Sequence, residues 1–167
     1  MTHFVEITEQ FIWELLNKIP DPEVPAISIV DLGVVRSVSV KNEMVEVAIT
    51  PTYTGCPALK EMENQIRKSL LEVGVAVEIK LIYKPAWTTD WMSEATKQKL
   101  KEYGIAPPEK ITFEHLHPFG NPNKAIIKCP FCNSENTALT SQFGSTACKA
   151  LYFCDGCHQP FEHFKCH

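Results

Sequence analysis

Long apolar runs are missing from this chain of 167 residues. No stretch approaches the ~20 apolar residues that a membrane span needs, and the opening MTHFVEITEQ holds no apolar signal segment. Internal repeats and low-complexity tracts are absent as well. We therefore expect a cytoplasmic protein with no membrane partner. In that reducing compartment, cysteine pairs are more often metal ligands or catalytic groups than disulfides.

An excess of basic residues is also missing, because the net charge is −4. Residues 1–120 carry 12 Lys and Arg against 17 Asp and Glu, and residues 121–167 carry 4 against 3. Binding to nucleic acid requires clustered Lys and Arg that neutralise phosphates, so no nucleic-acid partner is expected. The composition, 44% hydrophobic and 22% charged, is typical of a globular protein of one medium domain with a small addition.

Two short cysteine pairs are the strongest chemical signal in the chain. They are separated by 21 residues and consist of Cys129 with Cys132 and of Cys154 with Cys157. Each Cys-x-x-Cys turn aims two thiolates at one point, so together the pairs predict a tetrahedral metal site with bonds of ~2.3 Å. The spacing favours a zinc ribbon with structural zinc. Iron, alone or in a cluster, fits the same four sulfurs and stays open, whereas two disulfides do not suit the expected compartment.

Apolar periodicity predicts the other elements. Helical spacing covers residues 8–19 and 58–73, a weaker polar helix covers 93–103, and strand patterns cover 34–40, 44–49 and 75–81. Thr8 and Ser93 are expected N-caps, and Gly74 and Gly104 are expected helix ends.

The order of these elements predicts an α+β protein. Helix, two strands, helix and strand would form a small α/β domain with a mixed sheet over residues 1–106. A proline-rich linker is expected at 107–127, followed by the zinc ribbon at 128–167. The ribbon is too small for a sufficient core of its own, so metal binding would supply much of its folding free energy.

Cys56 lies between a predicted strand end and a predicted helix start, in the sequence TPTYTGCP. The unpaired N–H groups and the positive end of the helix dipole favour an anion there, which would make this thiol a better nucleophile or metal ligand. Simple packing of a small buried thiol is the alternative. Asp21 and Glu23 could approach the same edge, although turn and cap chemistry is the more common use of such residues.

Further candidates come from a loop and from the tail. Trp87 and Trp91, in PAWTTDWM, would either cover the core or bind a partner. Cys148 and Cys166 are two tail thiols that a four-cysteine site does not need, and they could be inert, alternative ligands or a second thiol site. No acid and base pair or Cys/His arrangement is evident, so direct catalysis is not expected.

These motifs resemble a known family. DPE followed by SIVDLG and TPTYTGCP is similar to the iron–sulfur assembly domain of SufT-type proteins. With PAWTTDWM, CPFC, FGSTACKALYFC, CDGC and PFEHFKC added, nearly the whole chain resembles the PaaD family, small subunits encoded with bacterial phenylacetyl-CoA epoxidases.

The resemblance implies an accessory protein of phenylacetate catabolism rather than an enzyme. It would help to mature the epoxidase, whose oxygenase has a di-iron centre and whose reductase has an iron–sulfur cluster and flavin. It also implies that Cys56 is the reactive cysteine, that Asp21 and Glu23 form the acidic motif, and that iron or a cluster binds transiently. A scaffold subunit that binds the same components without touching their metals is the alternative, and a homodimer is compatible with either.

Overall fold

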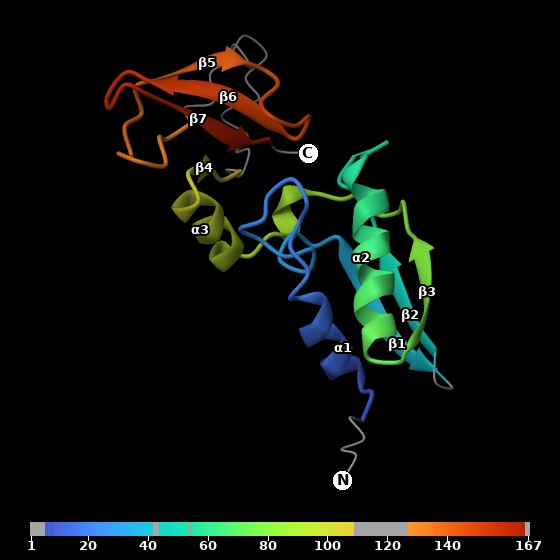
Figure 1. The fold of residues 1–167 in the computed structure, drawn as a ribbon. Coiled ribbons are helices and arrows are strands. Elements are labelled where there is room, and N and C mark those ends of the chain that lie inside the picture. Colours follow the sequence, from blue (N-terminus) through green and yellow to red (C-terminus); the bar gives the residue numbers. More distant parts are fainter. Residues whose placement is uncertain (1–5, 42–43, 54, 109–126, 166–167) are drawn as a thin grey trace. The chain divides into compact units, whose positions relative to one another are not determined.

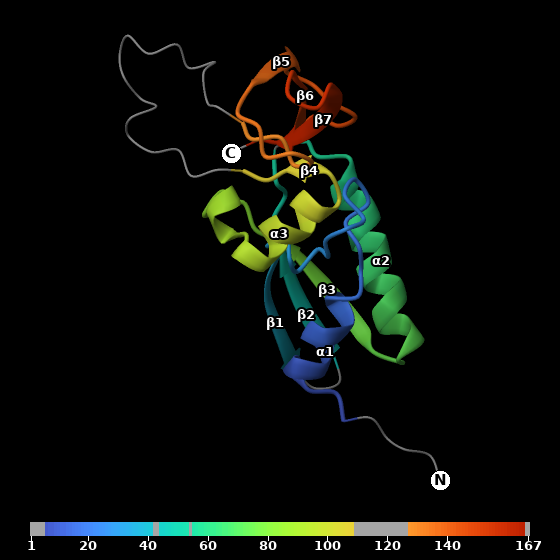
Figure 2. The same ribbon diagram turned by 90° about the vertical axis from the view of Figure 1, so that its left-hand side faces the viewer.

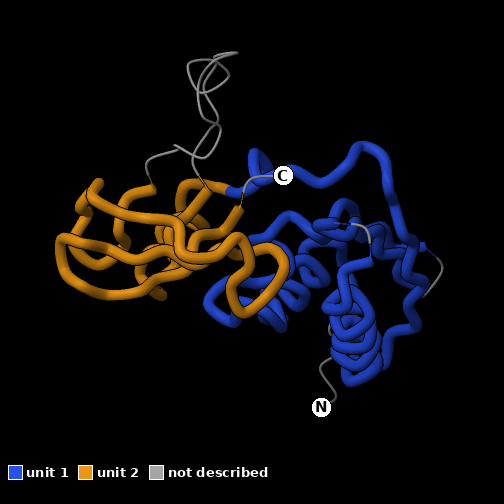
Figure 3. The backbone as a smooth tube through the Cα atoms, turned by 90° about the horizontal axis from the view of Figure 1, so that it is seen from above, with its two compact units in different colours: residues 1–92 blue, residues 93–167 orange. Residues whose placement is uncertain are grey.

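The computed structural model describes residues 6–41, 44–53, 55–108 and 127–165 (Figure 1). The chain divides into two compact units, Met1–Met92 and Ser93–His167 (Figure 3). The linker expected at 107–127 lies almost entirely outside the described residues. Within the described part, no helix has both the length and the apolarity to cross a membrane.

Unit 1 contains two α-helices, three strands and a short 3-10 helix. In chain order they are α1 (Glu9–Leu16), β1 (Val35–Lys41), β2 (Met44–Ile49), α2 (Ala58–Glu72), β3 (Ala76–Leu81) and η1 (Thr89–Trp91). The strand order is β1-β2-β3, with β1 antiparallel and β3 parallel to β2, which confirms the predicted mixed sheet. Figures 1 and 2 show α1 and α2 on one face of this sheet.

Apolar residues meet between the helices and the sheet. Fully or almost fully buried are Ile12, Leu16, Val45, Val47, Ile49, Met62, Ile66 and Leu70. The helical residues follow i, i+4 spacing and the strand residues follow period 2, so each element turns one apolar face to the core. The outer face of the sheet carries polar residues, among them Ser39, Glu46 and Lys80.

Local hydrogen bonds and capping residues determine where the helices begin and end. The Thr8 hydroxyl accepts a hydrogen bond from the Phe11 N–H at 3.1 Å and caps α1 as predicted. This helix ends at Leu16 rather than Ile19, because the N–H groups of Lys18 and Ile19 bond three residues back and tighten the last turn. At the end of α2, Gly74 has φ +76° and the Val75 N–H bonds the Leu70 carbonyl, a Schellman ending.

Unit 2 begins with a helix and continues into a four-stranded sheet. Its elements are α3 (Glu94–Glu102), β4 (Ile105–Ala106), β5 (Thr137–Ser141), β6 (Lys149–Cys154) and β7 (Gln159–Phe164). The strand order is β4-β7-β6-β5, with β4 parallel to β7 and the other neighbours antiparallel.

The core of unit 2 is small. One cluster contains Ala106, Ile127, Cys129, Cys154 and Phe161, with Tyr152 and Cys157 packed against it, and other buried residues of the unit include Leu100, Ile105 and Phe164. Two of the five buried members of this cluster are cysteines of the predicted metal site, so the apolar core and the thiol cluster are one structure. A metal bound to these cysteines would therefore act directly on the stability of this cluster.

Candidate functional site

The four cysteines of the predicted metal site come together in unit 2. Their Sγ atoms all lie within 4.8 Å of one another. The Cys132 and Cys154 sulfurs are 3.6 Å apart, and those of Cys129 and Cys157 are 3.7 Å apart. A tetrahedron with metal–sulfur bonds of ~2.3 Å has edges of ~3.8 Å, so the thiols already stand at the spacing of metal ligands. They are unbridged, at distances far beyond a disulfide bond of ~2.05 Å.

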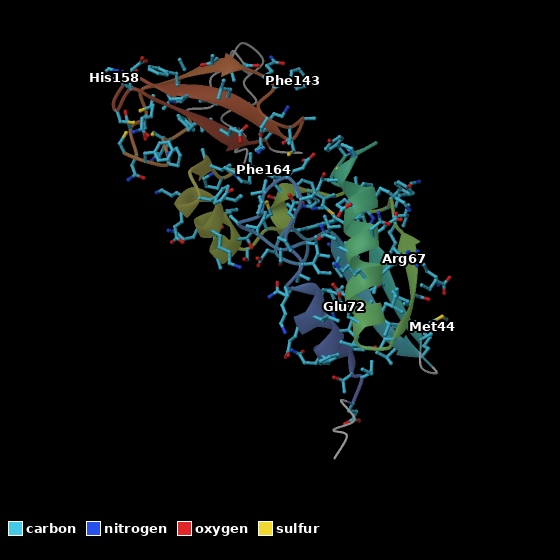
Figure 4. The ribbon with its side chains drawn as sticks, in the orientation of Figure 1. Met44, Arg67, Glu72, Phe143, His158 and Phe164 are labelled. Carbon is cyan, nitrogen blue, oxygen red and sulfur yellow. The ribbon has the colours of Figure 1, made fainter. Side chains whose placement is uncertain are left out.

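The two cysteine turns have the same backbone form. In the first, the Asn133 N–H donates to the Cys129 carbonyl at 2.9 Å, and in the second the His158 N–H donates to the Cys154 carbonyl at 2.8 Å. Asn133 and His158 both have φ +60°, a left-handed conformation in which Asn and His are enriched among non-glycine residues. Each chain segment thus turns sharply after its second cysteine, beside the sulfur atoms near His158 in Figure 4.

The thiols differ in how readily they ionise. Burial, together with hydrogen bonds to the neighbouring thiols, raises the pKa of the Cys157 thiol to about 12. Burial also acts to raise the pKa of Cys154, but hydrogen bonds from the backbone N–H of Cys157 and from the Cys132 side chain outweigh it and lower this pKa to about 7. In the bare cluster, Cys154 is therefore the thiol that its neighbours favour as a thiolate. A divalent cation among four sulfurs would instead hold all four as thiolates.

Cys56 lies in unit 1, two residues before α2, with its side chain partly exposed. Its N–H bonds the Tyr53 carbonyl at 3.3 Å, and its own carbonyl accepts from the Leu59 N–H at 3.3 Å. Gly55 beside it has φ +80°, and a Cβ built on Gly55 would meet no atom within 4 Å. The strand-to-helix placement predicted from the sequence is confirmed, and there is open space where a side chain at Gly55 would project.

Asp21 is buried in the loop after α1, where it organises the backbone. Its Oδ1 accepts from the Glu23 N–H at 2.9 Å and from the Val24 N–H at 2.6 Å. Its own N–H bonds the Ile27 carbonyl, which closes the loop. The turn chemistry foreseen for this residue is therefore present, and Glu23 stands half-buried on the turn that Asp21 holds.

Among the described residues, the four-cysteine cluster is the only group of three or more Cys, His, Asp or Glu that could hold a metal. Cys56, Asp21 and Glu23 do not form such a group within one described chain. A metal or cluster at Cys56 would therefore need ligands from elsewhere.

The two tryptophans of PAWTTDWM have different surroundings. Trp87 is 4% exposed and its indole N–H donates to the Leu32 carbonyl at 2.9 Å, so it covers the core of unit 1. Trp91 is half-buried, and the guanidinium carbon of Arg36 lies 3.5 Å from the centre of its ring. Sequence reasoning did not single out Arg36, because its place on β1 gives no sign of a distant aromatic partner. Gly33, with φ +77°, lets the backbone pass beside both rings.

The two extra tail cysteines differ in their surroundings. Cys148 is buried just before β6, with its Sγ 3.1 Å from the Thr146 hydroxyl oxygen, which identifies it as a packed, hydrogen-bonded thiol. Cys166 lies outside the described residues.

Two known families match separate parts of the chain. Residues 9–81 match the family described as "Iron-sulfur cluster assembly protein", and residues 116–165 match that described as "PaaD zinc beta ribbon domain". The first match covers the sheet and helices that carry Cys56, and the second covers all four clustered cysteines.

Individual relatives match different lengths of the chain. An Escherichia coli protein that is named as a subunit of a "Putative 1,2-phenylacetyl-CoA epoxidase" is 47% identical over 157 residues, which cover 93% of this chain and 91% of that protein. The Staphylococcus aureus "Fe-S protein maturation auxiliary factor SufT" is 38% identical over 80 residues, 46% of this chain and 90% of the relative.

A solved structure resembles part of the fold. The crystal structure of a DUF59 domain from Bacillus anthracis matches with a TM-score of 0.51 and 27% identity, and covers 55% of this chain and 90% of that one. With the assembly-type fold, the four-sulfur cluster and an almost full-length relative all established, the chain belongs to the PaaD family, in which an iron–sulfur assembly domain precedes a zinc ribbon.

Proposed function

We propose that this chain is a non-enzymatic accessory subunit of a phenylacetyl-CoA epoxidase in phenylacetate catabolism, and that it helps deliver iron or an iron–sulfur cluster to the epoxidase components. The relationship to an epoxidase subunit over nearly the whole chain supports the first part. The match of residues 9–81 to iron–sulfur assembly proteins supports the second. The reducing cytoplasm expected from the sequence would suit both.

The observation that carries the delivery hypothesis is the setting of Cys56. Its thiol is partly exposed at the start of α2, and the backbone before it, at Gly55, has open space around it. A transfer site must accept and release its cargo by ligand exchange, which a closed four-sulfur cage resists and an incomplete site permits. In this proposal the missing ligands come from the oxygenase or reductase component, or from a second copy. We keep Glu23, on the turn that Asp21 holds, as part of the proposed transfer surface, although these two carboxylates and Cys56 do not gather into one ligand group within the described chain.

We assign zinc to the four-cysteine cluster, with a structural role. Zinc prefers four tetrahedral sulfur ligands, and the thiols here stand at the required spacing within the core of unit 2. When bound, it would supply folding free energy and no redox chemistry. Cys129, Cys132, Cys154 and Cys157 would hold it, and the left-handed turns at Asn133 and His158 would keep the sulfurs in place.

We assign the docking of the epoxidase component that receives the metal to the segment around Trp91. Its half-buried ring and the Arg36 guanidinium above it offer an aromatic and a cationic group, two residue types enriched in interface hot spots. Trp87, buried and bonded to Leu32, would support this surface from below.

The Cys56→Ser substitution tests delivery. The variant and the wild type would each be produced with the epoxidase components in the absence of air, and the iron content and activity of the purified components measured. We expect both to fall at least several-fold with Cys56→Ser. The matched control is Cys148→Ser, because it removes a thiol of unit 2 and should leave iron loading unchanged. Full loading with Cys56→Ser would overturn delivery through this residue.

A non-catalytic scaffold is the second candidate, since the described residues of one chain provide no second metal group around Cys56. A scaffold would tolerate Cys56→Ser but lose the complex when Trp91 is replaced by Ala. Co-purification of the epoxidase components with each variant separates the two functions. Delivery predicts that Cys56→Ser keeps the complex and loses the iron.

A further inference from the structure

The outer edge of β3 is open in the described part of the chain. β3 is the last strand in the order β1-β2-β3, and the only elements it contacts are β2 and α2 (Figure 1). All six residues of β3 pair with β2 in regular register, whereas the pairing of β1 with β2 shifts between Val35 and Ser37. A regular open edge is a template for pairing with another strand.

The hydrogen-bonding direction of β3 follows from its pairing with β2. The Ile82 N–H bonds the Ile49 carbonyl at 2.8 Å, so even-numbered residues of this strand direct their N–H and C=O groups toward β2. Odd-numbered residues then direct theirs to the open edge. The Val77 carbonyl agrees with this, because it is reached from outside the sheet by the Arg67 guanidinium at 3.3 Å. Ile79 and Leu81 therefore present their backbone groups at this edge, and a partner strand would share the Val77 carbonyl with Arg67 or displace that side chain.

The side chains of β3 are complementary to themselves. The strand reads Ala-Val-Glu-Ile-Lys-Leu, and an antiparallel copy centred on Ile79 would place Glu78 opposite Lys80 twice. It would also place Val77 opposite Leu81 twice on the other face, where Leu81 is 41% exposed. Ile79 and its counterpart would form a hydrogen-bonded pair, since both direct their backbone groups outward. Opposite charges and apolar pairs directly across strands stabilise a sheet.

We propose that this edge pairs with β3 of a second copy of the chain, joining two three-stranded sheets around a twofold axis. The contact is isologous, because each residue of one strand meets its counterpart under the same symmetry. Lys80 would lie between Glu46 of its own chain, with which it forms an ion pair at 2.5 Å, and Glu78 of the second copy. A single strand pair buries little surface, so the dimer would be weak and concentration-dependent.

Charge reversal at one position tests the pairing. Glu78→Lys would place lysines opposite each other twice, and should raise the dimer dissociation constant about tenfold or more. The fold should tolerate it, because Glu78 is the direct neighbour of Glu46 on β2 and a lysine there gains an opposite charge. The matched control is Glu72→Lys, which makes the same charge change at the end of α2 and should dimerise like the wild type.

Sedimentation velocity from low micromolar to millimolar concentration gives the readout. Mixing Glu78→Lys with Lys80→Glu restores both cross-strand charge pairs, so the mixture should dimerise although each variant alone is monomeric. Amide exchange gives a second readout, with the Ile79 N–H protected in the wild-type dimer and exposed in Glu78→Lys. A wild type that stays monomeric throughout, or a dimer that Glu78→Lys leaves unchanged, would overturn the proposal.

Discussion

Single residues explain how the four-cysteine cluster is preorganised. The spacing of the cysteines predicts their convergence, and the sulfur distances of 3.6 and 3.7 Å confirm it. The sequence does not reveal that Asn133 and His158 adopt a left-handed backbone, because Gly is the usual residue for such a turn. Asn and His adopt this conformation more often than most other non-glycine residues, so their place directly after the second cysteine of each pair is the signal that could have been used. Roles at Cys56, Asp21 and Glu23 stay predictions.

His163 on β7 gives unit 2 a pH dependence. Burial lowers the pKa of this imidazole to about 4, more than the hydrogen bond with the Ala106 carbonyl raises it. Between pH 6.5 and 4 the unfolded chain binds a proton that the folded chain does not, so stability falls as pH falls through this window. The full loss is ~3 kcal/mol. Above pH 6.5 this residue has no effect.

Urea unfolding of the wild type and of His163→Asn measures this slope. Asn can still donate to the Ala106 carbonyl but does not titrate, and any loss of bound metal in acid would be common to both proteins. The wild type should therefore lose more stability than the variant between pH 6.5 and 4. Identical slopes would show that His163 is protonated in the folded protein.

At the scale of elements, the spacing of apolar residues predicted the helices and strands wherever one face of an element is buried. The helices at residues 58–73 and 93–103 and the three strands of unit 1 appear within two residues of their predicted bounds. The two-residue strand β4 could not be foreseen, because it has no periodicity and exists only through its pairing with β7. Sequence reasoning likewise saw two possible uses for the tryptophans, and only packing shows that Trp87 covers the core.

Two helix ends make a matched pair of tests. Gly74 and Gly104 have φ +76° and +90°, but a Cβ on Gly74 would meet nothing within 4 Å, whereas a Cβ on Gly104 would lie 3.0 Å from the Phe131 ring. Gly74→Ala should lower the free energy of unfolding by ~1 kcal/mol, from the left-handed backbone alone. Gly104→Ala should lower it further, because Phe131 must also move. Chemical denaturation measures both, and an equal loss would contradict the steric contribution at Gly104.

At the scale of the whole molecule, the two units carry different chemical features. The assembly-type fold carries a partly exposed cysteine at a strand-to-helix joint, and unit 2 gathers four thiols into its core. The sequence predicted both features, because each depends on local motifs. The proposed division assigns exchange of iron or a cluster to Cys56 and stability to the four-sulfur site.

Metal analysis of the chain, purified without air from cells that also make the epoxidase components, tests this division most directly. Wild type and Cys56→Ser would be compared for zinc, iron and acid-labile sulfide. We predict about one zinc per chain in both proteins, as a four-cysteine site binds one ion, with any captured iron present in the wild type only. Iron and sulfide that persist in Cys56→Ser in place of zinc would contradict the account, since they would place the exchanging metal in the four-cysteine site.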